Sequence, residues 1–299
     1  MITNMYFHKV NFNMIKKIRI ISVLFLLFFS SLNCNAYNPV KGIKDTSYNS
    51  NGWLFGMNIG CYFANRQTAN YYNVGGRINN LNYTIVTNRI NYDTLRQRFR
   101  NHDFYIDTTS LPQNMKYDPA INIGFHLRKM YKNQFSVFFE MNYSKLKAND
   151  VVIVHVEAIP TDSINDKAII SGEEVRTDIN IGISKEFVKN KISPFASIGV
   201  NMNNVKVSKS QVQVQGKVFD LENPTYAIYN IKQGGIGFGV FGSIGFDAKF
   251  GNNGMVSLGW SFSYKGIKLT DYEKPLLNNI VYMQILLNAA ALLGNKSSK

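Results

Sequence analysis

The chain has 299 residues, of which 45% are hydrophobic, and its formal net charge is +14. Such a basic balance is typical of nucleic-acid-binding proteins, but the lysines and arginines are scattered among predicted loops and turns, so we expect no nucleic-acid partner. The sequence contains no HExxH, CxxC, GxSxG or Walker pattern, and it therefore indicates no metal site and no cofactor.

Residues 1–36 are predicted to be a secretory signal peptide. A basic stretch that ends at Arg19 is followed by an apolar run over 20–29 and by the small-residue end Cys34-x-Ala36. This is the order of a cleavable export signal, and the run is too short for a membrane-spanning helix. Lipidation at Cys34 is an alternative to simple cleavage after Ala36.

The start of the mature chain follows from the same segment. Met14 is an alternative start, because an ordinary signal begins a few residues before its lysines. Residues 37–51 are rich in Asn, Ser, Lys and Gly without periodicity, so they are predicted to be a flexible lead-in. Cleavage after Ala36 would leave Cys61 as the remaining cysteine, which excludes an intrachain disulfide.

A period of two is clearest over residues 234–250 and 256–265. Large apolar side chains such as Phe238 and Trp260 alternate with positions that are mostly glycine, serine or single charges. This period predicts β-strands, and the turn signal at 251–254 predicts a hairpin. One apolar face and one small, polar face are typical of strands with lipid outside and a narrow lumen inside.

The same alternation predicts eight strands. They cover residues 53–64, 121–128, 135–144, 175–184, 192–203, 236–250, 256–265 and 281–289. Each has about the ten residues that a tilted crossing of the hydrocarbon layer takes. For the last segment a helix over 280–293 is an alternative, because Leu286 blurs the phase.

The connections between these strands alternate in length. Short turns are predicted at 129–133, 187–191 and 251–254, and long polar connections include 66–116 and 148–174. Within the first long connection, an alternating piece at 83–92 indicates a small hairpin. The predicted fold is all-β: an eight-stranded antiparallel up-and-down transmembrane β-barrel with long outer loops over 52–293, followed by a C-terminal tail at 294–299.

The sequence resembles a known group of protein families. The signal peptide, the alternating strands over 53–293, the Gly-spaced faces and the Asn/Lys/Ile-rich composition are similar to outer-membrane β-barrel families of Bacteroidetes-type bacteria. These are the PorT-like group and the broader OmpA/OmpX-like eight-stranded barrels. The resemblance implies a bacterial outer-membrane protein, and some members assist secretion or adhesion. The chain departs from many such barrels by ending Gly-Asn-Lys-Ser-Ser-Lys instead of on an aromatic residue.

The strand faces predicted to point inward carry charges. The set is Arg128, Glu140, Arg176, Asp178, Asp247 and Lys265. Counted from the short turns, Arg128 and Asp247 are expected at a similar low height, and the other four within a few residues of one another higher up. Because charges in so enclosed a space must be paired, we expect a structural plug of ion pairs and no open pore.

Three classes of function remain open from the sequence. The first is a non-enzymatic structural or interaction protein in the outer membrane, which presents loops to surface partners or to a secretion apparatus. The second is a barrel-borne lipid-modifying or protease-like enzyme with His102 and His155 in the loops as candidate catalysts. The third is a soluble exported barrel that carries a ligand, with its apolar faces turned inward. For the first class the expected partners are outer-membrane lipids and lipopolysaccharide.

Overall fold

The computed structural model describes residues 52–75, 80–131, 133–157, 164–221, 234–250, 254–269 and 275–288. The predicted signal peptide, the lead-in and the C-terminal tail lie outside these residues. Ten strands are present: β1 (Gly52–Phe63), β2 (Phe104–Ile106), β3 (Ala120–Met130), β4 (Phe135–Val156), β5 (Ile164–Glu186), β6 (Ile192–Val214), β7 (Lys217–Asp220), β8 (Gly234–Phe250), β9 (Gly254–Lys265) and β10 (Leu276–Asn288). The short helices are α2 (Arg66–Ala69), η1 (Asn70–Tyr72), η2 (Asn82–Thr87), α3 (Arg89–Arg98) and η3 (Thr108–Ser110).

All of these strands pair antiparallel in one sheet. Eight long strands pair in the order β1, β3, β4, β5, β6, β8, β9 and β10, and β10 pairs with β1 again. Each of the eight therefore has a neighbour on both sides. The two remaining strands are short additions, because β2 pairs with β4 and β7 pairs with β6. The expectation of an all-β antiparallel sheet is confirmed, with ten strands instead of eight.

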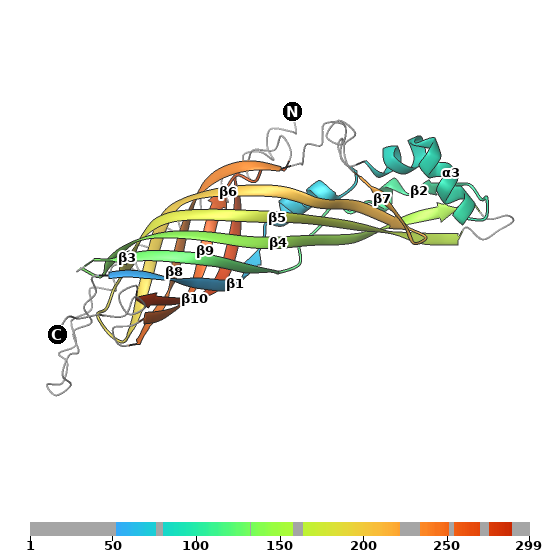
Figure 1. The fold of residues 1–299 in the computed structure, drawn as a ribbon. Coiled ribbons are helices and arrows are strands. Elements are labelled where there is room, and N and C mark those ends of the chain that lie inside the picture. The colour runs from blue at the N-terminus through green and yellow to red at the C-terminus, as the bar shows by residue number, and fades with distance from the viewer. Residues whose placement is uncertain are drawn as a thin grey trace, which may run out of the picture. The chain divides into compact units, whose positions relative to one another are not determined.

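Three strands are much longer than the ranges predicted from the sequence, although weak alternation through Val205, Val207 and Val212 already indicated a continuation of β6. β4 has 22 residues and β5 and β6 have 23 each, against 12 in β1, and they run on past their neighbours toward α3 and β2 (Figure 1). The prediction of a polar connection over 148–174 was wrong for the described residues there, since the period of two continues through it. Val152 and Val154 of β4 and Ile170 of β5 are buried on one face of these extensions, because they belong to a hydrophobic cluster with side chains from other segments.

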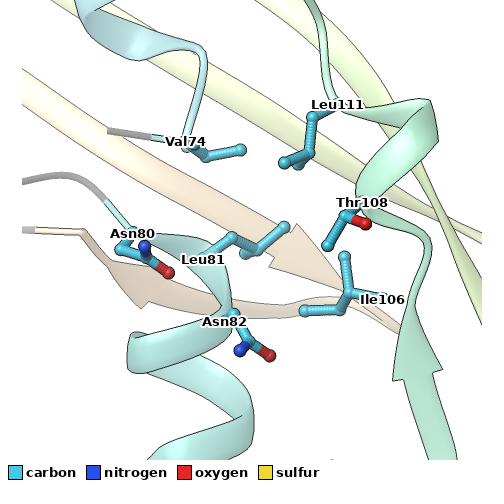
Figure 2. Close-up of a pocket in the computed structure, with 8 residues that line it drawn as sticks. Val74, Asn80, Leu81, Asn82, Ile106, Thr108 and Leu111 are labelled. Carbon is cyan, nitrogen blue, oxygen red and sulfur yellow. The ribbon is translucent and has the colours of Figure 1, made fainter. Parts of the chain in front are cut away.

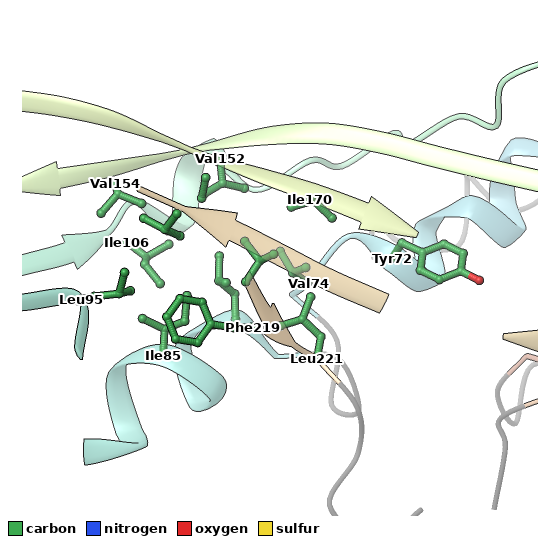
Figure 3. Close-up of a cluster of buried hydrophobic side chains, with 14 of the residues drawn as sticks. Tyr72, Val74, Ile85, Leu95, Ile106, Val152, Val154, Ile170, Phe219 and Leu221 are labelled. Carbon is green, nitrogen blue, oxygen red and sulfur yellow. The ribbon is translucent and has the colours of Figure 1, made fainter. Parts of the chain in front are cut away.

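This cluster belongs to a part of the protein that we call the lobe, formed by residues 66–75, 80–117, 146–157, 164–172 and 209–221. Its buried side chains come from the helical segments after β1 and from the extended ends of β4, β5, β6 and β7 (Figure 3). Leu95 from α3, Phe104 from β2 and Phe219 from β7 all belong to it. The segment predicted to be one long polar loop is therefore packed on its own core.

The hairpin predicted over 83–92 is wrong, because η2 and α3 occupy that segment. Leu81 and Ile85 at the start of and within η2, and Leu95 within α3, are almost fully buried in the lobe. Asn88 begins α3, since its side chain accepts a hydrogen bond from the backbone N–H of Asn91 at 3.3 Å. A short polar segment with few apolar residues is compatible with both the strand period and the helix period. Here it is helical, because the helical conformation buries its apolar residues in the lobe core.

The two faces of the eight long strands differ in chemistry. The exposed face is apolar, with Met57 66%, Ile198 62% and Phe238 69% exposed. Aromatic side chains stand near both ends of this belt, namely Trp53, Tyr131 and Phe250 at the turn end and Phe63, Tyr143 and Tyr264 at the lobe end. The buried face carries most of the polar and charged groups. Among the described residues, no helix is long and apolar enough to cross a membrane.

Candidate functional site

The candidate site is the network of charged groups on the buried face. One member near the turn end is the ion pair between Arg128 of β3 and Asp247 of β8, at 3.0 Å between Nη1 and Oδ2, with both side chains almost inaccessible. The Arg128 guanidinium also donates to Nε2 of His126 at 3.3 Å and lies over the ring of Phe195. The two charges that the sequence placed at one height are thus in direct contact.

Glu140 of β4 lies above this pair. Asn58 donates to its Oε1 at 2.8 Å, Asn142 donates to the same oxygen, and Nδ1 of His126 lies 3.7 Å from Oε2. Within the described residues the basic side chain nearest to Glu140 is therefore a histidine. The strand register places Glu140 opposite Asn180, two residues from Asp178, but Arg176, Asp178 and Lys265 take other ion-pair partners.

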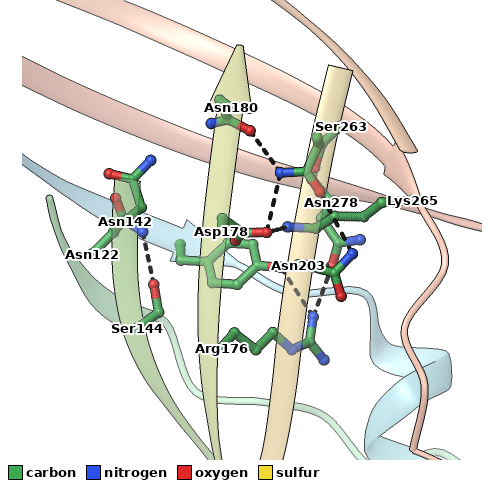
Figure 4. A network of polar contacts seen from close by, with 12 residues as sticks. Asn122, Asn142, Ser144, Arg176, Asp178, Asn180, Asn203, Ser263, Lys265 and Asn278 are labelled. Carbon is green, nitrogen blue, oxygen red and sulfur yellow. Dashed lines mark hydrogen bonds and ion pairs between the residues drawn. The ribbon is translucent and has the colours of Figure 1, made fainter. Parts of the chain in front are cut away.

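Lys265 of β9 and Asp178 of β5 form the next ion pair (Figure 4). Asn201 also donates to Asp178 Oδ1, at 3.2 Å, and the Lys265 ammonium lies 5.3 Å from the ring centre of Tyr62. Both charged side chains are almost fully buried. Because their strands are not neighbours, the pair spans the enclosed interior and joins opposite parts of the sheet.

Arg176 of β5 is hydrogen-bonded to four other side chains. Its Nε donates to Oε1 of Glu174 at 2.6 Å, and neither side chain is accessible to solvent. Its other nitrogens donate to Tyr62 Oη at 2.9 Å, to Thr68 Oγ1 at 2.9 Å and to Asn278 Oδ1 at 3.2 Å. The guanidinium therefore joins β5, β1, β10 and the first helical turn after β1.

Glu174 was missed by the sequence reasoning, which placed it at the end of a loop. Its position two residues before Arg176 puts it on the same strand face, and that shared phase is the signal that could have found it. Tyr72 and Tyr117 both donate to its Oε2, at 3.0 Å and 2.9 Å. Burial and the negative charge of Glu174 raise the pKa of both tyrosines well above their usual range, so they remain donors.

The segment that carries Thr68 and Tyr72 lies against the lobe end of the interior. The ring of Tyr72 packs on Gly172, where an added Cβ would come within 2.3 Å of the ring. Asn65 holds the start of the segment, since its backbone N–H donates to Asn278 Oδ1 at 3.1 Å and its side chain donates to the Leu277 carbonyl at 3.0 Å. The helical turns α2 and η1 are thus bonded to the same network as the interior charges.

A further buried pair lies at the turn end, where Lys249 of β8 donates to Glu186 of β5. The sequence reasoning did not single out either residue. Lys249 has the same phase as Asp247 on β8, and Glu186 has the same phase as Asp178 on β5, so the alternation carried the signal.

The structure gives different neighbours to His155 and to the segment that carries His102. His155 of β4 stacks on Tyr105 of β2 and lies 3.7 Å from Asp107. Asp103, next to His102, instead pairs with Arg96 at 3.0 Å. No group of three or more His, Cys, Asp or Glu side chains is placed to hold a metal ion in the part of the chain that the structure describes.

The lobe contains a small pocket of about 220 Å³ (Figure 2). Its lining is Val74, Gly75, Asn80, Leu81, Asn82, Ile106, Thr108 and Leu111. None of these residues ionises near neutral pH, so the lining offers neither a general acid or base nor an activated nucleophile.

The fold and the network define an all-β protein whose exposed sheet face is apolar and whose interior is held by ion pairs. No family model matches the chain, and no curated protein matches it. Solved structures match it distantly. Neisserial surface protein A is 7% identical with a TM-score of 0.39, covering 79% of this chain and 96% of that chain. The outer membrane protein OprG from Pseudomonas aeruginosa is 8% identical with a TM-score of 0.36, covering 81% and 96%.

A third solved structure is Ail, the attachment invasion locus protein of Yersinia pestis, in complex with the heparin analogue sucrose octasulfate. It is 11% identical with a TM-score of 0.31, covering 79% of this chain and 98% of that chain. Likenesses at this level carry no argument about function, which is drawn below from the chain's own geometry.

Proposed function

We propose that this chain is an integral protein of the bacterial outer membrane, in which the eight long strands close into a transmembrane β-barrel. The supporting observation is the exposed face, where large apolar side chains form a continuous belt flanked by aromatic residues. In water such an exposed apolar face would promote aggregation. In a membrane it is the surface that contacts the lipid acyl chains.

The strand pairing supports the same proposal. Every strand of the eight has a partner on both sides, so there is no free edge among them. In lipid each unpaired backbone N–H or C=O costs several kcal/mol, and only helices and closed barrels avoid that cost. A ligand-carrying soluble barrel would need its apolar faces inside, whereas here the apolar face is exposed and the buried face is polar.

The role that we propose is structural or interactive and not enzymatic. Three buried ion pairs, Lys249–Glu186, Arg128–Asp247 and Asp178–Lys265, join different strands across the interior, and the buried Arg176–Glu174 pair lies along β5. An interior of this kind acts as a plug and not as a substrate path. The lobe instead offers a folded surface to a partner at the cell surface or in a secretion apparatus, with outer-membrane lipids and lipopolysaccharide around the belt.

Membrane fractionation followed by gel electrophoresis with and without heating tests the membrane assignment. The protein is expected in the outer-membrane fraction, and the unheated sample is expected to migrate differently from the heated one because the barrel stays folded in detergent. Recovery in the soluble exported fraction would contradict the proposal.

The enzymatic alternative has its own test. Lipase and protease assays on the purified protein are compared with assays on His102→Ala and His155→Ala variants. We expect no activity in any of the three, and an activity lost in either variant would favour the enzyme over the interaction protein.

A further inference from the structure

Four lysines surround one glutamate on the exposed face, where the lobe joins the belt. Lys145 and Lys147 come from β4, Glu173 from β5, and Lys206 and Lys209 from β6. Strand register places them in two adjacent rows. Lys147, Glu173 and Lys209 lie opposite one another, and Lys145 and Lys206 flank Val175 in the next row toward the belt.

Glu173 organises this cluster. Nζ of Lys145 lies 2.6 Å from its Oε2 and Nζ of Lys147 lies 4.0 Å from its Oε1. The hydrogen bond from Lys145 lowers the pKa of Glu173, and Lys209 acts in the same direction by its charge. One carboxylate thus interacts with the ammonium groups of Lys145, Lys147 and Lys209, so positive charge exceeds negative charge around Glu173.

The position of the lysine cluster relative to the apolar belt determines which part of the lipid lies beside it. Tyr143 on β4 is half exposed and Met202 on β6 is exposed, and these are the last belt residues on their strands. Lys145 follows Tyr143 by two residues, a rise of roughly 7 Å along the strand. Lysines placed so close beyond an apolar belt lie at the depth of lipid headgroups, where their long side chains reach phosphate groups.

We propose that Lys145, Lys147, Lys206 and Lys209 bind the phosphate groups of lipid A in the surrounding leaflet, a proposal that rests on the proposed membrane location. The ligand is a phosphorylated glycolipid and not free phosphate. An exposed lysine surface holds a small mobile anion weakly in salt, whereas acyl chains along the belt keep a lipid phosphate at the cluster.

Glu173 sets the strength of this site. Its carboxylate holds Lys145 in place and at the same time repels a phosphate. Replacing it by glutamine removes one negative charge and frees the ammonium groups for the ligand, so Glu173→Gln is expected to bind lipid A more tightly than the wild type.

The test uses the purified full-length protein in detergent micelles, with binding of diphosphoryl lipid A followed by native mass spectrometry. The double variant Lys145→Gln/Lys147→Gln is expected to bind about tenfold or more weakly. Lys167→Gln is the matched control, because Lys167 is an exposed lysine on the same face of β5 but lies six residues further from the belt than Glu173, a rise of roughly 20 Å. It should bind as the wild type does.

Dephosphorylated lipid A and inorganic phosphate complete the test. Loss of binding with the dephosphorylated lipid, and no competition from inorganic phosphate at matched concentration, support the proposal. Equal binding of the two lipids, competition by inorganic phosphate, or wild-type binding by the double variant overturns it. Heating-dependent gel migration of each variant is measured in parallel, so failure of membrane folding is distinguished from failure of phosphate recognition.

Discussion

Arg176 and Glu174 lie two positions apart on β5, and Nε of Arg176 donates to Oε1 of Glu174 at 2.6 Å with neither side chain accessible to solvent. Residues at this spacing share one face of a strand, so the pair needs no long-range register to form. Tyr62, Thr68 and Asn278 then accept from three of the four remaining guanidinium N–H groups. A locally formed pair thus anchors three other parts of the chain.

Removing one member of this pair should destabilise the protein strongly. Arg176→Ala leaves Glu174 buried without its cation, and we expect a loss of about 3–5 kcal/mol in the free energy of unfolding. Denaturant unfolding in micelles measures the loss. As a control, Arg89→Ala removes an arginine whose side chain is 93% exposed, and it should change stability by less than about 1 kcal/mol. Equal losses in the two variants would mean that the buried pair has no special role.

Gly172 is expected to be required for the packing of Tyr72. Gly172→Ala places a Cβ within 2.3 Å of the Tyr72 ring, which must move and give up its bond to Glu174. We expect a loss of about 1–3 kcal/mol in stability and faster tryptic cleavage at Arg66. Gly242→Ala is the matched control, since its Cβ would meet only the Ser197 carbonyl oxygen at 3.6 Å. Unchanged cleavage in Gly172→Ala would speak against this packing.

The interior is expected to conduct no ions in a stable way. Side chains occupy the space inside the sheet: the ion pairs Arg128–Asp247 and Asp178–Lys265, and the rings of Phe138 and Phe241, whose centres are 5.9 Å apart. An eight-stranded barrel leaves little more room than its side chains fill. Planar-bilayer recordings should show silence or rare small events. Long-lived stepwise currents of porin size from the purified protein would refute the plug.

The contact between Lys145 and Glu173 predicts a pH dependence. The pKa of Glu173 is lowered from its ordinary value of 4.5, chiefly by the hydrogen bond from Lys145. The folded state therefore binds this proton less readily than the unfolded state does, so the stabilisation is present above 4.5 and is lost as the pH falls through the lowered pKa. Stability curves of the wild type and of Glu173→Gln should converge on acidification, and a constant gap would exclude this origin. The difference is small, because exposed ion pairs are screened by solvent.

Local alternation in the sequence determined the strands and their faces. Arg128 and Asp247 could be placed inside and at one height, because side chains alternate across a strand and the short turns give a common origin for counting. The same alternation indicated the apolar face that lies outside. These features depend on neighbours in the chain, and for that reason they could be predicted without knowledge of the fold.

Tertiary structure alone decided partner choice and strand length. Glu140 has His126 beside it and Lys265 has Asp178, and counting from the turns gave only a common height for the charges and not which of them would pair. β4, β5 and β6 extend into the lobe because Leu95, Phe104 and Phe219 supply a core against which their alternate residues are buried. The burial of those residues depends on segments that are distant in sequence. The pattern of the polar segment 83–92 is compatible with a strand or a helix, and packing against the lobe core decides for the helix.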